Sequence, residues 1–202
     1  MPVERVRAVV VRLHEAFPKV RGGQAWDRRG SMNRNWQLLF DRLDKDKSGR
    51  LDYDEFQKAV REELRVTDTT DQELRALWAY VDHDKSGEVT INEFQHGCYL
   101  LILEGWPLLS KDSLEKIVSI INGAAKRWLH ASSWVNVFRA IDQDDNDRLG
   151  YDELERVVRA NGTQGGLSLT TSELTDNDLR GLWRALDRDV SGEVTIDEFM
   201  NF

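Results

Sequence analysis

The sequence predicts an all-α protein of two lobes, each built from a pair of helix-loop-helix units, with extra helices at the N-terminus and between the lobes. Three observations predict this fold. A twelve-residue frame of oxygen-bearing side chains occurs four times in the 202 residues. Apolar residues at helical spacing flank each frame. Tryptophan and phenylalanine recur at matching distances before the odd and the even frames, which indicates duplication of a whole pair.

Residues 1–32 are predicted to form a basic amphipathic arm. Its apolar stripe consists of Val3, Val6, Val10, Leu13 and Phe17. Residues 1–34 carry a net charge of +5, whereas the rest of the chain carries −13. Three roles are open to such an arm: docking on its own lobe, attachment to an anionic membrane, or contact with an acidic protein surface. Membrane contact is the less favoured role, because the chain begins Met-Pro-Val-Glu and lacks the second-position glycine of a myristoylation signal.

The first frame spans residues 44–55, in the stretch FDRLDKDKSGRLDYDEF. A calcium ion takes about six to eight oxygen ligands, which a short loop supplies at alternate residues, with a backbone carbonyl at place seven. The ligand places hold Asp44, Asp46, Ser48, Arg50 (through its carbonyl), Asp52 and Glu55. Gly49 at place six permits the sharp turn with positive φ. A final Glu can offer both carboxylate oxygens, which favours calcium over magnesium.

The frame recurs in residues 82–93, 142–153 and 187–198. The candidate ligands are Asp82, Asp84, Ser86, Glu88 and Glu93 in the second loop, Asp142, Asp144, Asn146, Arg148 and Glu153 in the third, and Asp187, Asp189, Ser191, Glu193 and Glu198 in the fourth. Each loop has an apolar eighth residue, which is predicted to form a short antiparallel bridge with the partner loop.

The third loop departs from the pattern at two places. Asp147 stands where the turn glycine belongs, and Gly150 occupies place nine. Aspartate reaches the left-handed region only at a cost of about 1 kcal/mol. The sequence therefore predicts that residues 142–153 form the weakest of the four calcium sites.

Ligand spacing, turn glycine and flanking helices together resemble the EF-hand superfamily, and in particular its four-hand, calmodulin-like members, over residues 33–202. The resemblance implies an N-terminal pair in residues 33–110 and, after an inter-lobe helix, a C-terminal pair in residues 111–202. It also implies Ca²⁺ as the bound ion, at up to four loops, with Mg²⁺ as an alternative occupant at rest.

Three further segments carry predictions. Residues 98–109 are strongly apolar, but they are too short to span a bilayer and are interpreted as an exiting helix. Residues 112–130 are predicted to form an amphipathic helix, and the glycine-rich insertion at 161–173 a mobile surface loop. Only four residues follow Glu198, so the last exiting helix is predicted to be short. Either another segment, such as the N-terminal helix or a partner, completes the apolar wall of this lobe, or the natural chain continues beyond Phe202.

Three functions compete for such a protein. It could be a sensor that regulates a protein partner, a calcium buffer, or a structural and regulatory module docked on a larger assembly such as a cytoskeletal array or an enzyme. Three or four acidic ligands per loop favour sensor-range affinity. The chain has three methionines, too few for the flexible groove of a promiscuous binder, so the expected partner is one dedicated amphipathic helix or assembly.

Other classes have little support in the sequence. No catalytic constellation or phosphate-binding glycine loop is present, so the protein is not expected to be an enzyme. The net charge of −8 and the lack of a basic aromatic groove argue against nucleic acid as a partner. One cysteine and no secretory signal make the cytoplasm the expected location.

Overall fold

The computed structural model describes residues 1–16, 32–129, 134–142, 145–162 and 166–202, with the side chains of 32–35, 128–129 and 134 left out. The described chain is mostly helical, with two small sheets, and this confirms the predicted all-α class. It divides into two compact units, one made of residues 1–28 and 33–105 and the other of 29–32 and 106–202. Among the described residues, no helix combines the length and the hydropathy needed to span a bilayer.

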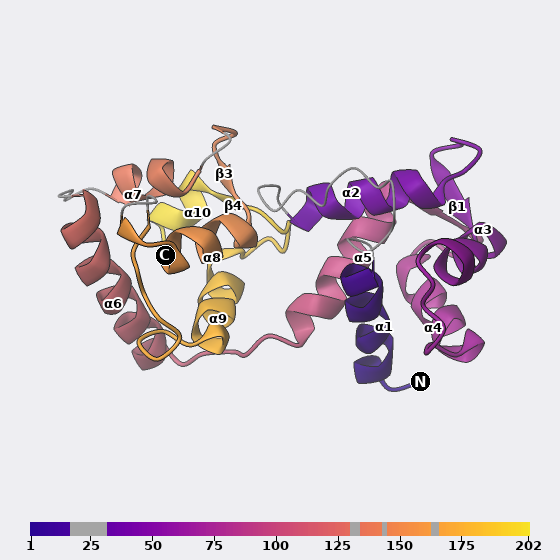
Figure 1. Ribbon diagram of the computed structural model, residues 1–202, viewed down its shortest axis with the longest axis horizontal. Helices are drawn as coiled ribbons and strands as arrows, with labels where there is room; N and C mark the ends of the chain where they lie inside the picture. Colours follow the sequence, from indigo (N-terminus) through magenta and orange to yellow (C-terminus); the bar gives the residue numbers. More distant parts are fainter. Residues whose placement is uncertain (17–31, 130–133, 143–144, 163–165) are drawn as a thin grey trace. The chain divides into compact units, whose positions relative to one another are not determined.

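The N-terminal unit holds the first two helix-loop-helix hands and one preceding helix (Figure 1). Its elements are α1 (Val3–Ala16), α2 (Met32–Leu43), β1 (Arg50–Asp52), α3 (Tyr53–Lys58), the π-helical turn η2 (Ala59–Glu63), α4 (Asp71–Val81), β2 (Glu88–Thr90) and α5 (Ile91–Glu104). Helix α4 begins where the sequence places a capping box: the N–H of Glu73 donates to Oγ1 of Thr70 at 3.2 Å, and the N–H of Thr70 donates to Oε2 of Glu73 at 2.9 Å.

The C-terminal unit repeats this order. Its elements are α6 (Lys111–Leu129), α7 (Trp134–Ile141), β3 (Arg148–Leu149), α8 (Tyr151–Arg159), α9 (Asp176–Leu186), β4 (Val194–Thr195) and α10 (Ile196–Met200). In both units the loops meet through the predicted antiparallel bridge, which pairs Leu51 with Val89 and Leu149 with Val194. All four of these side chains are at most 1% exposed, so the bridge holds the two ion loops of a pair back to back.

Aromatic side chains form the core of the N-terminal unit, as their helical spacing predicts. Trp36 is fully buried and meets Phe94 edge to face, with ring centroids 5.8 Å apart. Trp78 packs against Tyr53 at 5.7 Å. In the C-terminal unit Trp183 takes the place of Trp78 and meets Tyr151 at 5.7 Å. The side chain of Trp134, which recurs at the same distance before its loop as Trp36 does, lies outside the described ones.

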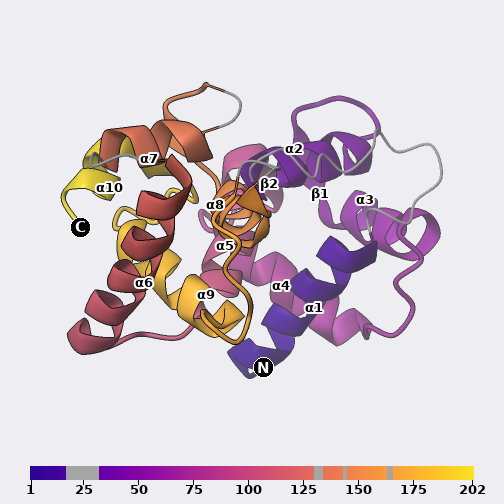
Figure 2. The same cartoon turned by 60° about the vertical axis from the view of Figure 1, so that its left-hand side comes forward.

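Helix α1 lies along α4 and α5 of its own pair, which both views show (Figures 1 and 2). Of the three roles open to the arm, the structure therefore shows contact with its own lobe. The buried stripe differs from the predicted one at two described residues. Val9 is buried, whereas Val3 is 39% exposed, because the helix begins at Val3 and its first turn projects beyond the lobe. Phe17, the last predicted member, lies outside the described residues.

Acid is expected to weaken the docking of α1 through His14. This imidazole packs on Trp36, and burial lowers its pKa below the ordinary value of 6.5, although the charge of Glu15 acts in the opposite direction. The docked state therefore binds fewer protons than the unfolded one, so stability is fully present above pH 6.5 and is lost as the pH falls below it. Denaturant unfolding at pH 7.5 and 5.5 should show a larger loss in the wild type than in His14→Gln; equal losses would contradict this.

Two connecting segments differ from their predictions. Helix α5 ends at Glu104, short of the predicted Leu109, because Pro107 cannot continue it. The following residues belong to the C-terminal unit, where the Trp106 ring lies 4.5 Å from that of Tyr151 and Nη1 of Arg184 donates to the Trp106 carbonyl at 2.7 Å.

The insertion at 161–173 is the second such segment. Leu167 and Leu169 are at most 5% exposed, and their N–H groups donate to the carbonyls of Val157 and Val158 on α8 at 2.7 and 3.0 Å. The prediction of a mobile surface loop is therefore wrong for the second half of the insertion. Its leucines complete the apolar core, and glycine content alone did not reveal this.

Candidate metal centres

Three of the four predicted loops bring three carboxylates together. One oxygen from each residue lies within 4.8 Å of the others in the sets Asp44, Asp46 and Glu55; Asp82, Asp84 and Glu93; and Asp187, Asp189 and Glu198. These are places one, three and twelve of the frame. The first aspartate of each set is at most 9% exposed, because it directly follows an entering helix, whereas the second projects toward solvent.

Backbone N–H groups orient the buried first aspartate in each loop. In the first loop, Oδ2 of Asp44 accepts from the N–H of Gly49 at 2.9 Å and Oδ1 accepts from the N–H of Ser48 at 3.1 Å. Asp82 and Asp187 repeat this pattern with Gly87 and Gly192, each at 3.1 Å. Hydrogen bonds from the main chain fix the direction of each carboxylate. Each loop is therefore already shaped around its first ligand.

The oxygen atoms at places five and seven of the first, second and fourth loops also lie close together. The Ser48 hydroxyl donates to the Arg50 carbonyl at 2.9 Å, Ser86 to Glu88 at 2.7 Å, and Ser191 to Glu193 at 2.8 Å. Two further predicted oxygen ligands therefore lie side by side in each of these loops. Hydroxyl, carbonyl and carboxylate oxygens are the donors that a hard cation such as calcium prefers.

The last glutamate of each loop is tied to the start of its exiting helix. In the fourth loop, Oε2 of Glu198 accepts from the N–H of Thr195 at 2.9 Å, and Oγ1 of Thr195 accepts from the N–H of Glu198 at 3.3 Å. The same capping box joins Thr90 to Glu93 and Asp52 to Glu55. Asp52, predicted as a ligand, thus caps α3, with its Oδ1 accepting from the N–H of Glu55 at 2.7 Å. The carboxylate of the last glutamate thus holds the start of the exiting helix and also belongs to the cluster.

Opposite pKa shifts mark the first cluster. Hydrogen bonds from the hydroxyl and then the N–H of Ser48 lower the pKa of Asp46. Desolvation, followed by the charges of Asp46, Asp52 and Asp44, raises the pKa of Glu55. The cluster therefore gathers negative charge that its own neighbours do not neutralise. A divalent cation would remove this repulsion, so the donor set and the charge both fit calcium.

Two places in each loop take the left-handed conformation. Gly49, Gly87 and Gly192 at place six have φ of +77°, +84° and +83°. Lys47, Lys85 and Val190 at place four have φ of 57–58°. The turn glycine at place six was predicted from the sequence, but place four was missed, because no glycine or asparagine marks it.

Relieving the strain at Val190 is expected to stabilise the C-terminal unit. A β-branched residue is a strong outlier at positive φ, and the left-handed region costs an L-residue about 1–2 kcal/mol. Val190→Asn should therefore raise the free energy of unfolding by about 1 kcal/mol. The matched change in the second loop, Lys85→Asn, should gain less, since lysine is unbranched. Denaturant titration measures both, and a Val190→Asn variant no more stable than the wild type would contradict the account.

The third loop follows the same plan as far as the structure describes it. Oδ1 and Oδ2 of Asp142 accept from the N–H groups of Asn146 and Asp147 at 3.1 and 3.0 Å. Asp147 adopts the glycine-like conformation, with φ of +59°. Gly150 takes the ninth place, and its N–H donates to Oε2 of Glu153 at 2.9 Å. Asp144, the predicted third-place ligand, lies outside the described residues.

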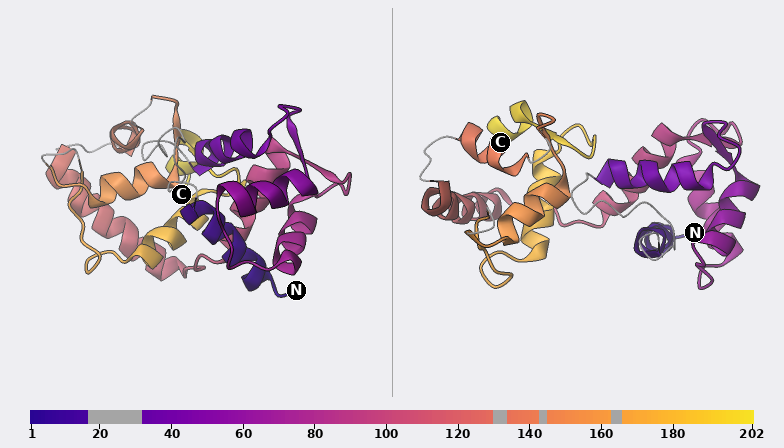
Figure 3. Two further views of the ribbon diagram at one scale, coloured as in Figure 1. Left: turned by 45° about the vertical axis from the view of Figure 1, so that its right-hand side comes forward. Right: turned by 45° about the horizontal axis from the view of Figure 1, so that its top comes forward.

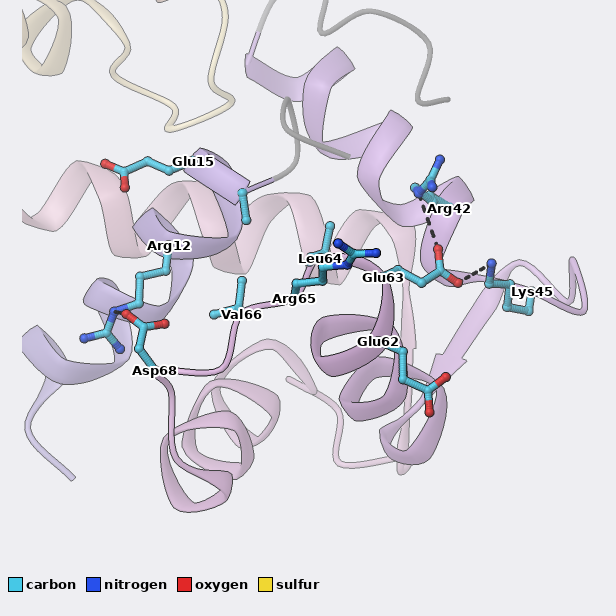
Figure 4. Close-up of a pocket in the computed structure, with 11 residues that line it drawn as sticks. Arg12, Glu15, Arg42, Lys45, Glu62, Glu63, Leu64, Arg65, Val66 and Asp68 are labelled. Carbon is cyan, nitrogen blue, oxygen red and sulfur yellow. Dashed lines mark ion pairs between the residues drawn. The ribbon is translucent and has the colours of Figure 1, made fainter. Parts of the chain in front are cut away.

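Each unit also contains a cavity. In the N-terminal unit a charged pocket of about 810 Å³ opens beside the end of α1 (Figure 4). Its charges are largely paired: Arg12 with Asp68 at 3.3 Å, and both Arg42 and Lys45 with Glu63. In the C-terminal unit an apolar groove has a volume of about 500 Å³. Its walls include Leu114 and Val118 of α6, Ile141 of α7, Leu186 of α9, and Phe199 and Met200 of α10.

Comparisons with known proteins agree with this geometry. The family model for an EF-hand domain pair matches residues 34–99 and again residues 132–202. The chain is 23% identical over 172 residues to the 16 kDa calcium-binding protein of Schistosoma mansoni, and this alignment covers 85% of this chain and 95% of that protein. It is 25% identical over 178 residues to calcium-binding protein CML19 of Arabidopsis thaliana, and this alignment covers 88% of this chain and 86% of that protein. Calmodulin-like proteins of this kind typically bind calcium without catalysing a reaction. The two matched pairs and the three carboxylate clusters show that the chain belongs to the EF-hand family of calcium-binding proteins.

Proposed function

We propose that this protein is a calcium sensor whose C-terminal pair presents an apolar groove to one dedicated protein partner. One observation carries the proposal: residues that line the groove are chain neighbours of the ligands. Ile141 precedes Asp142, Leu186 precedes Asp187, and Phe199 follows Glu198.

This adjacency provides a short mechanical path from ion to groove. Glu198 caps α10 through Thr195, so a shift of this carboxylate toward an ion carries α10 with it. Phe199 and Met200 on the same helix form part of the groove wall. A change in ligand position therefore becomes a change in groove shape, which is how sensor pairs of this family expose apolar surface.

The groove favours a specific partner. Leucine, isoleucine, valine and phenylalanine dominate its lining, and Met200 is the one methionine among the lining residues. Stiff side chains select one shape, whereas methionine-rich grooves adapt to many. Lys111, Arg188 and Glu115 stand beside the apolar residues. An amphipathic helix with a branched apolar stripe and acidic flanks suits this lining.

Ion stoichiometry is part of the proposal. We assign calcium to the loops at 44–55, 82–93 and 187–198, and a weaker site to 142–153, with Mg²⁺ as the competing ion at rest. The acidic ligand count supports affinities on the order of 10⁻⁷ to 10⁻⁵ M, the range of sensors. Binding of four divalent ions would offset the formal charge of −8 and reduce the repulsion of an acidic partner.

A calcium titration with an apolar-surface dye at fixed millimolar magnesium tests the sensor role. Dye emission should rise at micromolar calcium, since the groove becomes accessible. Met200→Glu should reduce the rise, because it places a charge in the groove at a side chain that is already 47% exposed. Leu108→Glu, at a position 80% exposed and absent from the groove lining, is the matched control and should leave the rise unchanged. Calcium binding without any change in dye emission would favour a buffer or a constitutive structural module instead.

A further inference from the structure

Helix α1 is deeply buried in the N-terminal unit. Val9, Val10 and Leu13 are fully buried and Val6 is 5% exposed, although all four lie on a short helix outside the two hands. The right-hand view of Figure 3 looks down α1 and shows it beside the helices of its own pair. The stripe has the i, i+3, i+4, i+7 spacing with which an amphipathic helix fills an apolar groove.

Polar contacts fix α1 along its length. Nε of Arg7 donates to the Leu101 carbonyl at 2.6 Å near the end of α5, and the Arg7 guanidinium lies 3.7 Å from Glu104. Further along the helix, Arg12 pairs with Asp68 at 3.3 Å (Figure 4). Arg12 also donates to the buried Thr69 hydroxyl at 3.2 Å. Both arginines thus contribute to docking, which accounts for part of the basic charge of the arm.

Helices α4 and α5, along which α1 lies, are the entering and exiting helices of the second hand. Helix α4 ends at Val81, directly before Asp82, and α5 begins at Ile91 and contains Glu93. The angle between α4 and α5 is therefore set by the same loop that holds the second carboxylate cluster. A helix that touches both α4 and α5 favours one angle between them, so its docking and ion binding at the loop are thermodynamically linked.

We propose that α1 is a built-in ligand of the N-terminal pair, which covers its apolar face and raises the calcium affinity of loops 44–55 and 82–93. The direction follows from the packing: α1 lies along both α4 and α5 and buries Val9, Val10 and Leu13 there, and the apolar surface of such a pair is exposed in its open, calcium-favoured arrangement. The inference rests on the proposed calcium-dependent opening. It assigns the two pairs different roles, because the N-terminal face is already filled by the chain itself, and the output to a partner then comes from the C-terminal groove.

The test compares two substitutions one residue apart in the full chain. Val10→Asp places a charge in the buried stripe, whereas Val11→Asp places it on the outer face, at a side chain that is 41% exposed. Both are made together with Glu153→Gln and Glu198→Gln, so that calcium titration calorimetry reports mainly the N-terminal loops. Val10→Asp should weaken their affinity about fivefold or more, the usual lower size of such couplings, and Val11→Asp should not. Trypsin cleavage at Arg12, faster in Val10→Asp, shows that α1 has been released.

A second variant and an add-back guard against simple unfolding. Arg7→Ala combined with Arg12→Ala removes the polar ties and leaves the apolar stripe intact, and it should also weaken calcium binding. A peptide of residues 1–16 added to Val10→Asp should restore the affinity. Released α1 with unchanged or tighter calcium binding overturns the proposal. That result is distinct from failure of the sensor role, which the dye titration of the C-terminal groove detects in the unmodified chain.

Discussion

Glu93→Gln is expected to weaken calcium binding at the second loop by about 10- to 100-fold or more, the loss seen when even an outer-shell partner of a metal site is removed. The substitution keeps the shape of the side chain. It also keeps the N-terminal cap of α5, because the amide oxygen can still accept from the N–H of Thr90. It removes the charge and one of the two oxygens that a bidentate carboxylate offers. Titration calorimetry measures the loss as a site that no longer fills in the micromolar range.

The same substitution at an exposed glutamate outside the loops is the control. Glu62→Gln on η2 changes the net charge equally but should leave all sites intact. If Glu93→Gln bound calcium as the wild type does, the assignment of the twelfth place as the closing ligand would fail. The parallel changes Glu55→Gln and Glu198→Gln extend the test to the first and fourth loops.

Trp36→Ala should reduce the free energy of unfolding of the N-terminal unit by about 3–5 kcal/mol, the usual cost of deleting a fully buried aromatic side chain. Trp36 is 0% exposed and contacts both His14 on α1 and Phe94 on α5, at ring distances of 5.6 and 5.8 Å. The cavity left by its removal would therefore loosen α1 as well as the core. Denaturant unfolding followed by circular dichroism measures the change.

Trp36→Phe gives the matched comparison. It keeps an aromatic ring in the site and removes the indole N–H, which is buried without a hydrogen-bond partner among the described residues. Trp36→Phe should lower the free energy of unfolding clearly less than Trp36→Ala does. The loss of some packing is offset in part, because the variant no longer buries an unsatisfied donor. Equal losses in the free energy of unfolding for the two variants would mean that an aromatic ring at this site does not stabilise the unit through its packing.

Much of the fold could be predicted, because the ion loops fix their own local structure. Alternating oxygens, a glycine at place six and an apolar eighth residue are local signals, and they predict both the loops and the bridges Leu51–Val89 and Leu149–Val194. Capping boxes such as Thr70 with Glu73 are equally local. Each of these signals lies within one ion loop or at the start of one helix, so a single sequence is enough to find it.

Features that depend on distant contacts could not be predicted in the same way. The burial of Leu167 and Leu169 arises from α8, and the packing of Trp106 from Tyr151. The sequence indicates an amphipathic arm but not which face of its lobe the arm covers. Its apolar spacing also predicted a buried Val3, which is exposed. Asp52 fits both a ligand place and an N-cap, and only the 2.7 Å contact with the N–H of Glu55 shows that it caps α3.

Hydrogen exchange of the whole chain with and without calcium tests the sensor account most directly. We expect calcium to change amide exchange in α7, α9 and α10, the helices that carry Ile141, Leu186 and Phe199 into the groove. Calcium should also slow exchange at the amides of Val9 and Val10, because ion binding and α1 docking strengthen each other. Changes confined to the ion loops, with none in the groove helices, would contradict the claim that ion binding in this protein is transmitted to a partner site.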